Sequence, residues 1–339
     1  MTDLIKSMLL AIETELQKQV SRLDAARTQI YHEMLTYHMG WSGEGAGPGA
    51  AGKRIRPLLV LLTTAAAGSP SDVGWEIALP AAAAVELIHN FSLVHDDIQD
   101  NSEKRRGRPT LWVKWGMPQA INAGDGLFVL SNLATTDLIG SYPAETVVKA
   151  AQILQNTCLD LTRGQYLDIS YEKRADLVVE DYWPMISGKT AALLSGCCAI
   201  GALLGGADEP TIDAYRSFGH YLGLAFQVQD DILGIWGNEA VTGKSAASDL
   251  LVGKKSIPVL VGLEKKGRFA ERWMQGPIHP DEVEEIARLL ANEGGYAYTH
   301  AMSKQMTDMA INSLREADPQ GDAGDALIDL TDKLLKREA

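Results

Sequence analysis

Apolar residues recur at helical spacing along most of the chain. At the N-terminus, Leu4, Met8, Ile12 and Leu16 fall on one face of a predicted amphipathic helix. Longer patterns of the same period cover 78–100, 119–140, 144–172, 181–204, 209–235 and, apart from Gly294 and Gly295, 280–317. The sequence contains no run of strand-like alternation and no repeat of fixed period. The pattern therefore predicts an all-α protein with about ten or more helices.

Two glycine-rich segments interrupt the helical pattern. Residues 41–52 read WSGEGAGPGAAG, and residues 318–325 read DPQGDAGD. Both are predicted loops, because glycine and proline at this density do not sustain a helix. Neither segment is long enough to separate two domains, so we expect a single domain over residues 1–339.

The composition narrows the function classes. The chain is 46% hydrophobic and 22% charged, with a formal net charge of -13. Such an acidic protein lacks the basic footprint that nonspecific nucleic-acid binding requires. It also repels anionic substrates on average. A phosphate site would therefore need clustered Arg and Lys side chains, or bound cations.

The cysteines and the apolar segments bear on location. The three cysteines lack the spacing of a zinc site or a disulfide framework, which favours a reducing cytoplasm. The N-terminus lacks the apolar core of a signal peptide. The uncharged run from Thr190 to Ala207 is only just long enough to span a membrane and is rich in small residues. We read it as a buried helix and expect no stable membrane insertion.

One strongly apolar helix ends in a cluster of carboxylates. Residues 88–100 read IHNFSLVHDDIQD and contain Asp96, Asp97 and Asp100. Asp96 and Asp100 would share a helix face, where they repel each other unless a cation neutralises them. Oxygen ligands with open coordination positions suit Mg²⁺. A solvated helix end would also explain the carboxylates, but the apolar flank and the following arginine pair favour a metal-bridged diphosphate.

Two further charged segments lie elsewhere in the chain. Asp230 and Asp231 end a second apolar helix, and three lysines follow them: Lys244, Lys254 and Lys255. Residues 52–57, directly after the first glycine-rich segment, read GKRIRP and contain three basic residues: Lys53, Arg54 and Arg56. Such a loop can close on a phosphate, although the motif alone is a weak signal.

Together these segments closely resemble the trans-isoprenyl diphosphate synthases, the polyprenyl synthetase family. The matching segments are GKRIRP at 52–57, IHNFSLVHDDIQD at 88–100, RRGRPT at 105–110, NAGD at 122–125, RGQYLDI at 163–169, GKTAALL at 188–194, FQVQDD at 226–231, TGKSAASDL at 242–250 and GKKSIP at 253–258. So many segments in the same order are far more specific than any one motif. The resemblance implies helices around a central cavity and a homodimer.

The resemblance also implies roles for individual residues. Asp96 and Asp100 would bind Mg²⁺ on the allylic diphosphate with help from Asp97, and Asp230 would hold a third ion, with Asp231 nearby. Contacts to the allylic diphosphate would come from Arg105, Lys189 and Lys244. The diphosphate of isopentenyl diphosphate would be bound by Lys53, Arg56, His89 and Arg106. Thr190 and Gln165 would lie near the allylic cation, Asp168 near the metals, and Gln227 and Lys254 on the substrate side of the cavity.

The chemistry of prenyl transfer agrees with this set of residues. Breaking an allylic carbon–oxygen bond leaves pyrophosphate and a carbocation, and Mg²⁺, Lys and Arg stabilise the leaving charge. The released pyrophosphate can take the proton lost after condensation, so no protein base is needed. Two positions depart from the family pattern: Gly234 stands where the second motif usually has Asp, and Arg163 where relatives often have Glu.

The product and the competing functions depend on few positions. In this family, bulk at the positions of Phe91 and Ser92 limits chain length, and a single aromatic there favours geranylgeranyl diphosphate over a farnesyl or longer product. A class I terpene cyclase would have no reason to keep Lys53, Arg56 and His89 together. A catalytically silent partner subunit could lose the carboxylates of 88–100, which this chain keeps. The apolar helix over 119–140 is the expected dimer contact.

Overall fold

The computed structural model describes residues 3–68, 74–237 and 247–335, and over these residues the protein is almost entirely α-helical. The all-α prediction is confirmed. The chain divides into two compact units. Unit 1 contains residues 1–156, 196–212 and 318–327, and unit 2 contains residues 157–195, 213–317 and 328–339.

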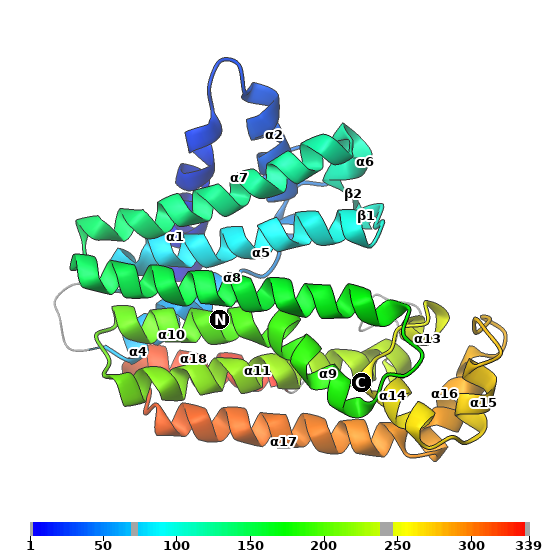
Figure 1. The fold of residues 1–339 in the computed structure, drawn as a ribbon. Helices are drawn as coiled ribbons and strands as arrows, with labels where there is room; N and C mark the ends of the chain where they lie inside the picture. The colour runs from blue at the N-terminus through cyan, green and yellow to red at the C-terminus, as the bar shows by residue number, and fades with distance from the viewer. Residues whose placement is uncertain (1–2, 69–73, 238–246, 336–339) are drawn as a thin grey trace. The chain divides into compact units, whose positions relative to one another are not determined.

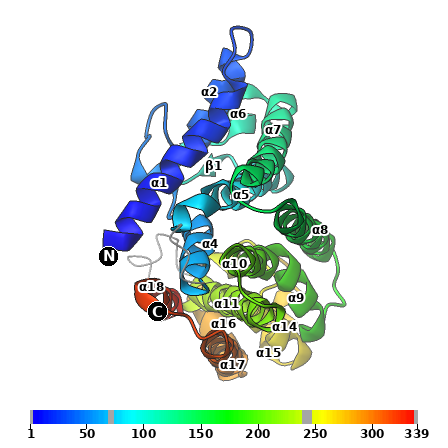
Figure 2. The ribbon, with the colours of Figure 1, turned by 90° about the vertical axis from the view of Figure 1, so that its left-hand side faces the viewer.

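Unit 1 is built on two long helices that pack side by side. These are α5 (Leu79–Gln99) and α7 (Met117–Thr136) (Figure 1). In the N-terminal half of α5, every residue from Ala81 to Ile88 is buried, and all of them except Glu86 are apolar. Two further helices, α1 (Asp3–Val20) and α4 (Ile55–Ala66), pack against α5 and against each other (Figure 2). The core of unit 1 therefore anchors the N-terminal part of α5 and leaves its C-terminal end free to carry polar groups.

A short hairpin follows α5. Strands β1 (Lys104–Arg105) and β2 (Arg108–Pro109) pair in antiparallel register, with Arg105 opposite Arg108. The two connecting residues, Arg106 and Gly107, both have positive φ, 52° and 77°. Positive φ at both central positions defines the tight turn whose twist matches a hairpin. The turn explains the order of residues in the RRGR segment, because glycine occupies the second left-handed position.

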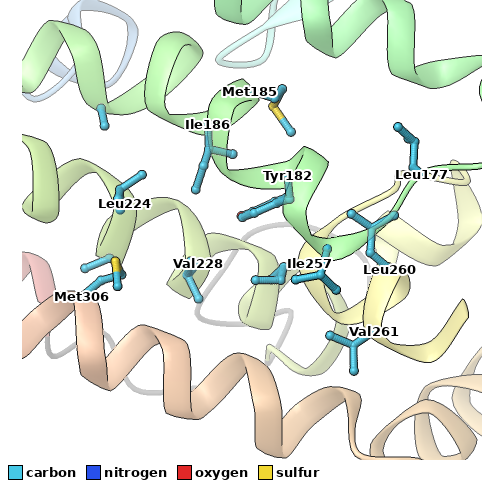
Figure 3. Packing of buried hydrophobic residues seen from close by; sticks show 13 residues of the cluster. Leu177, Tyr182, Met185, Ile186, Leu224, Val228, Ile257, Leu260, Val261 and Met306 are labelled. Atoms are coloured by element: carbon cyan, nitrogen blue, oxygen red, sulfur yellow. The ribbon is translucent and has the colours of Figure 1, made fainter. Parts of the chain in front are cut away.

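Unit 2 has an apolar core formed by α9 (Val179–Ile186), α11 (Glu209–Trp236), α14 (Ile257–Glu264) and α17 (Gly295–Glu316). Figure 3 shows the buried Tyr182 ring among Ile186, Val228 and Ile257. A second buried cluster surrounds Phe269. Burying an aromatic ring with its hydroxyl requires a hydrogen-bond partner, and Tyr182 has one, as described below.

Two glycines allow a close approach between two helical segments of unit 2. A Cβ on Gly164 would lie 2.0 Å from the backbone nitrogen of Lys189, and one on Gly188 would lie 2.6 Å from the carbonyl oxygen of Asp160. Only glycine permits this approach of η4 (Ser187–Ala191), a π-helical segment, to α8 (Ala144–Glu172). Single π-helical turns within a helix are frequent at functional sites.

The structure corrects three details of the expected elements. The glycine-rich segment 41–52 was expected to contain no helix, but it contains the short α3 (Pro48–Ala51) because proline suits the first helical position and Gly52, at φ 88°, ends it. The C-terminal helix α18 begins at Gly321, inside the expected loop. The expected helix 181–204 is divided into α9, η4 and α10 (Ala192–Leu204).

The other helices of the described residues are η1 (Ser21–Leu23), α2 (Gln29–His38), η2 (Trp75–Ala78), α6 (Leu111–Trp115), η3 (Asp137–Gly140), α13 (Ser248–Leu251), α15 (Arg268–Trp273), α16 (Val283–Asn292) and α18 (Gly321–Leu335).

Two helical stretches within the described residues, 75–99 and 179–204, are long and apolar enough to cross a membrane. The most apolar 18-residue part of each stretch is 61% and 67% buried in the fold, respectively. Such burial is typical of core helices. The three cysteines are free and buried.

Candidate active site

The first carboxylate cluster lies at the C-terminal end of α5. Asp96 and Asp97 belong to its last turn, and Asp100 is the residue that caps it, with its N–H bonded to the carbonyl of Asp96. Asp96 is half-buried and Asp100 is exposed. The C-terminal end of a helix already carries partial negative charge. Carboxylates at this end therefore create a strongly negative position that favours a cation.

The three carboxylates differ in their contacts. Asp97 is 3% exposed and accepts hydrogen bonds from Arg105 at 2.9 and 3.0 Å through Nε, with a further ion-pair contact to Nη2 at 2.7 Å. Burial raises the pKa of Asp97, while Arg105 opposes that rise. Asp97 thus anchors the β1–β2 hairpin to α5. Asp96 and Asp100 are the cluster members whose side chains reach solvent.

A group of basic residues occupies the same unit. Burial lowers the pKa of Arg56 and also that of Arg106. Among the described residues neither forms an ion pair, and Nε of Arg56 is buried without a hydrogen-bond partner. Arg106 donates to the carbonyl of Ala50 at 2.7 Å, and a Cβ on Gly52 would lie 2.6 Å from its guanidinium. The charge of Glu86 opposes this lowering of both pKa values without pairing directly with either guanidinium, so both keep N–H donors that suit an anion.

Two histidines lie within this basic cluster. Burial, followed by the charges of Arg56, Arg106 and Arg105, holds the pKa of His89 well below its ordinary value. Burial, followed by the charge of Arg105 and that of Arg106, lowers the pKa of His38 to about 3. Both imidazoles are therefore neutral near pH 7, when each can donate one hydrogen bond without adding charge. His38 and the three hairpin arginines, Arg105, Arg106 and Arg108, line a small pocket in unit 1.

The basic residues do not all serve the same purpose. Arg54 is 4% exposed and binds Glu13 at 2.6 Å and Glu86 at 2.8 Å. Arg108 donates to the carbonyls of Tyr37, Ser42 and Glu44 and so holds the glycine-rich segment. Both are structural, although their sequence context does not separate them from their neighbours. Lys53, by contrast, is exposed.

Unit 2 contributes a second set of polar residues. Lys189 of η4 forms an ion pair with Asp168 of α8. The hydroxyl of Thr190 donates to Oε1 of Gln227 on α11 at 2.9 Å. Gln165 lies one turn before Asp168 on α8 and is half-buried. The close approach at Gly164 and Gly188 places Lys189 of η4 within reach of Asp168 on α8.

Asp231 is the centre of a buried network that the sequence did not reveal. It is fully buried and accepts hydrogen bonds from the Tyr182 hydroxyl at 2.6 Å, the Ile257 N–H at 3.2 Å, Gln227 at 3.1 Å and Lys254 at 3.1 Å. Burial, then Asp231, raises the pKa of Tyr182 well above its ordinary value, so the phenol remains a donor. With four donors, Asp231 positions its neighbours. Tyr182 was missed, because a tyrosine in an apolar helix carries no motif.

The neighbours of this network include the expected metal ligand. Asp230 is half-buried on α11, one residue before the central carboxylate. The ammonium of Lys254 bridges Asp231 and Asp249, at 3.1 and 3.4 Å. The charge of Asp231, before that of Asp249, raises the pKa of Lys254. Lys244, expected to contact the allylic diphosphate, lies outside the described residues.

The residues expected to set chain length lie on α5. The Phe91 ring packs against Phe128 of α7 at a centroid distance of 5.3 Å and against His95 at 4.8 Å. The Ser92 hydroxyl donates to the carbonyl of His89 at 2.8 Å. Phe91 is therefore held in place by neighbours, whereas Ser92 adds little volume.

The donor set fits Mg²⁺ that is shared with a diphosphate. No group of three His, Cys, Asp or Glu side chains in the described part of the chain lies close enough to hold a metal alone. Asp96 and Asp100 offer two carboxylates one turn apart, and Asp230 offers another on α11. Mg²⁺ is usually bound by one or two carboxylates, with water and phosphate completing its shell. The carboxylates of each unit, taken by themselves, therefore suit a metal that arrives with its phosphate ligand.

Comparison with known proteins gives consistent matches. Residues 47–290 match the family model described as polyprenyl synthetase. A geranylgeranyl diphosphate synthase of Mycobacterium tuberculosis (strain ATCC 25618 / H37Rv) is 38% identical, over 99% of this chain and 95% of that protein. A (2E,6E)-farnesyl diphosphate synthase of Mycobacterium bovis is 34% identical, over 97% and 91%. The crystal structure of geranylgeranyl pyrophosphate synthetase from Pyrococcus horikoshii Ot3 gives a TM-score of 0.87 at 32% identity, covering 98% of this chain and 99% of that chain.

The neutral state of His38 makes the stability of the protein sensitive to acid. The unfolded chain takes up a proton here below the ordinary pKa of 6.5, whereas the folded protein does so only near pH 3. Lowering the pH through this window favours unfolding by about 1.4 kcal/mol per unit. We predict that His38→Gln flattens the fall in urea unfolding midpoint between pH 7 and pH 5, measured in phosphate-free buffer. The exposed His279→Gln is the control, and an unchanged pH dependence in His38→Gln would contradict the assignment.

Proposed function

Because the chain belongs to the polyprenyl synthetase family and is a prenyltransferase, we propose that it condenses isopentenyl diphosphate with an allylic diphosphate to give geranylgeranyl diphosphate. The observation that carries the site assignment is the basic cluster of unit 1, in which Arg56 and His89 are half-buried and Arg106 is exposed. Arg56 and Arg106 form no ion pair in the described structure and lie near neutral His89. A diphosphate would satisfy these groups.

The basic cluster is assigned to isopentenyl diphosphate. Arg56, Arg106 and the exposed Lys53 provide positive charge, and His89 provides a neutral donor. Burial strengthens a charge-assisted hydrogen bond and makes an unpaired guanidinium costly. A diphosphate that reaches the half-buried Arg56 therefore gains binding energy that contacts with the exposed Lys53 and Arg106 alone would not supply.

The carboxylates are assigned to the allylic diphosphate. Asp96 and Asp100 would hold Mg²⁺ on the leaving group, and Asp230 would hold a third ion. When bound, Mg²⁺ supplies positive charge that stabilises the departing pyrophosphate. Arg105, Lys189 and Lys244 are assigned to the same leaving group, so they would compensate charge as the carbon–oxygen bond breaks. In the structure, Arg105 pairs with Asp97 and Lys189 pairs with Asp168. A bound diphosphate would share each cation with its carboxylate partner.

The groups around Thr190 are assigned to the allylic cation. The Thr190 hydroxyl donates to Gln227, which leaves its oxygen lone pairs available. Gln227 in turn donates to Asp231, so its orientation is fixed. Fixed dipoles aimed at a developing positive charge stabilise it without reorganisation. Gln165 belongs to the same assignment, Asp168 would orient Lys189, and Lys254 would remain near the metal side of Asp231.

The product is assigned from α5. The growing chain would extend from Asp96 toward the N-terminal part of the helix, past Ser92 and Phe91. Phe91 is braced by Phe128, so it forms a firm obstacle, while Ser92 leaves space. One aromatic at this level favours a product longer than farnesyl diphosphate.

We assign one functional domain to the whole chain, because the family match at 47–290 includes residues of both units.

A second copy of the chain is the proposed partner. On α7, the large apolar side chains Met117, Ile121, Val129 and Leu133 are 48, 43, 55 and 41% exposed. They recur at multiples of four residues and therefore share one face of the helix. A stripe of this kind on one long helix is typical of a subunit contact. We assign a homodimer on this basis. We assign a cytoplasmic location because the three cysteines are free and buried.

Removing either solvent-reaching carboxylate tests the activity. We predict that Asp96→Ala and Asp100→Ala each lower kcat by about 10²-fold or more with the unfolding midpoint unchanged or raised, because the cluster is repulsive without its metal. Turnover is measured with isopentenyl diphosphate, farnesyl diphosphate and Mg²⁺. Glu145→Ala, an exposed carboxylate of α8, is the control. Near-normal turnover in either aspartate variant would refute the metal assignment.

Chain length is tested by adding and removing bulk on α5. We expect Ser92→Phe to shift the product from geranylgeranyl toward farnesyl diphosphate, because the ring fills the space beside Phe91. Phe91→Ala should give longer products. Chromatography of the dephosphorylated products measures both shifts, and Ser141→Phe, at an exposed position, controls for the added ring. Unchanged chain length in both variants would remove the basis of the product assignment.

The dimer contact is tested by charge. The double variant Val129→Asp, Leu133→Asp should reduce the solution mass from twice 36.7 kDa to a single chain, because it buries two unpaired carboxylates in an apolar contact. Light scattering after size exclusion reports the mass. Leu10→Asp, on α1 and 72% exposed, is the matched control. A monomeric wild type, or a double variant as dimeric as Leu10→Asp, would disprove the assignment.

A further inference from the structure

Tyr182 is a buried polar residue to which the proposed reaction assigns no role. Its ring lies among Ile186, Val228 and Ile257 in the apolar core of unit 2 (Figure 3). It also packs edge-on against Trp183, with the ring centroids 5.5 Å apart. These contacts hold the ring in place, so the hydroxyl donates its one hydrogen bond from a fixed position.

That hydroxyl anchors one of the two carboxylate oxygens of Asp231. Oδ2 of Asp231 accepts from the Tyr182 hydroxyl at 2.6 Å and from the Ile257 N–H at 3.2 Å. Ile257 is the first residue of α14, where backbone N–H groups have no partner within the helix. Because the tyrosine comes from α9 and the amide from α14, Oδ2 is tied to two elements of the core.

The other oxygen of Asp231 binds two polar side chains. Oδ1 accepts from Nε2 of Gln227 at 3.1 Å and from Lys254 at 3.1 Å. An ionised carboxylate has about four lone-pair sites, so the donors on its two oxygens saturate Asp231. With Nε2 of Gln227 bound to Asp231, its Oε1 is the atom that accepts from Thr190, at 2.9 Å. A chain of hydrogen bonds thus runs from Tyr182 through Asp231 and Gln227 to Thr190.

We propose that Tyr182 is a positioning residue for prenyl transfer, because it holds the Asp231 carboxylate that orients the Gln227 amide. This inference rests on the proposed function, which assigns Thr190 and Gln227 to the allylic cation. With the amide oriented as it is, the Thr190 hydroxyl donates to Gln227 and keeps its lone pairs for the cation. A reversed amide would instead donate to Thr190 and take up a lone pair. Dipoles fixed before the reaction stabilise a developing charge without reorganisation.

The phenol is the donor best placed to hold this arrangement. Its contact with Asp231 is the shortest that the carboxylate makes. The ammonium of Lys254 is shared with Asp249 at 3.4 Å, and its side chain is 40% exposed. Without the phenol hydroxyl, a buried carboxylate oxygen lacks a partner, which is costly, and rotation of the carboxylate can recover a donor. Such a rotation would release the Gln227 amide.

The experiment measures the condensation step separately from substrate binding. Single-turnover rates are measured with enzyme in excess over farnesyl diphosphate, at saturating isopentenyl diphosphate and Mg²⁺, and KM for isopentenyl diphosphate is measured at steady state. We expect Tyr182→Phe to slow condensation by about 10-fold and to leave KM within about twofold, because a misplaced dipole acts on the transition state. Tyr221→Phe is the matched control and should condense at the wild-type rate. Tyr221 packs against the same apolar core from α11, and its hydroxyl forms no hydrogen bond among the described residues.

A double-variant cycle separates positioning from a general loosening of the core. Gln227→Met keeps the length of the side chain but has no amide to orient. Adding Tyr182→Phe to Gln227→Met should therefore slow condensation no further, whereas damage to the packing would multiply with the effect of the first substitution. Unfolding midpoints show that each variant is folded at the assay temperature.

The outcomes separate this inference from the proposed function. A wild-type rate in Tyr182→Phe, or rate losses that multiply in the double variant, would overturn the positioning role and leave the prenyl-transfer assignment intact. If Tyr182→Phe does not fold, Asp231→Asn tests the next link, because an amide cannot accept hydrogen bonds on both sides as the carboxylate does. A wild-type rate in Asp231→Asn would equally overturn the role. A wild-type protein that forms no condensation product would refute the proposed function itself.

Discussion

Charges of like sign held close together are the constraint on which both polar centres of this protein depend. In unit 1, Arg54 and Arg105 form ion pairs with carboxylates. Arg56 and Arg106 form none among the described residues. The two nearby histidines stay neutral because protonation would add to the same charge. The packed apolar helices α4, α5 and α7 supply the stability that holds this cluster together. A bound anion would relieve the repulsion and stabilise the fold by mass action.

The helical periodicity predicts most of the secondary structure, because the apolar face of a long helix appears in the sequence as apolar residues at regular helical spacing. The expected helix at 144–172 coincides with α8, and the one at 209–235 differs from α11 by one residue. The π-helical segment η4 was not predictable in this way. Its backbone follows the contact of Gly188 with α8, and that contact joins residues distant along the chain. Interactions of this kind leave no local period to read.

Within each motif the sequence identifies the chemistry but cannot separate the roles of neighbouring residues. Asp96 and Asp97 are adjacent, yet only Asp97 is buried against Arg105, since consecutive residues of a helix point in different directions. Arg54 and Arg56 differ in the same way, with two carboxylates holding only the first. Asp231 looks like a second copy of a metal ligand in the sequence, and its four donors make it a structural centre instead. Burial and partners divide residues that a motif groups together.

The second acidic motif shows the opposite limit of reading a sequence. Gly234 suggests a lost carboxylate when the motif is read along α11, but the sequence does not show which groups surround that position in the fold. Asp249 lies fifteen residues later, beyond the segment that the structure does not describe, and still fills the position beside Gly234. With no side chain at 234, the Asp249 carboxylate lies against α11 and 3.4 Å from the Lys254 ammonium. A motif read one position at a time records the missing side chain and cannot show this neighbour, because the neighbour comes from a different element.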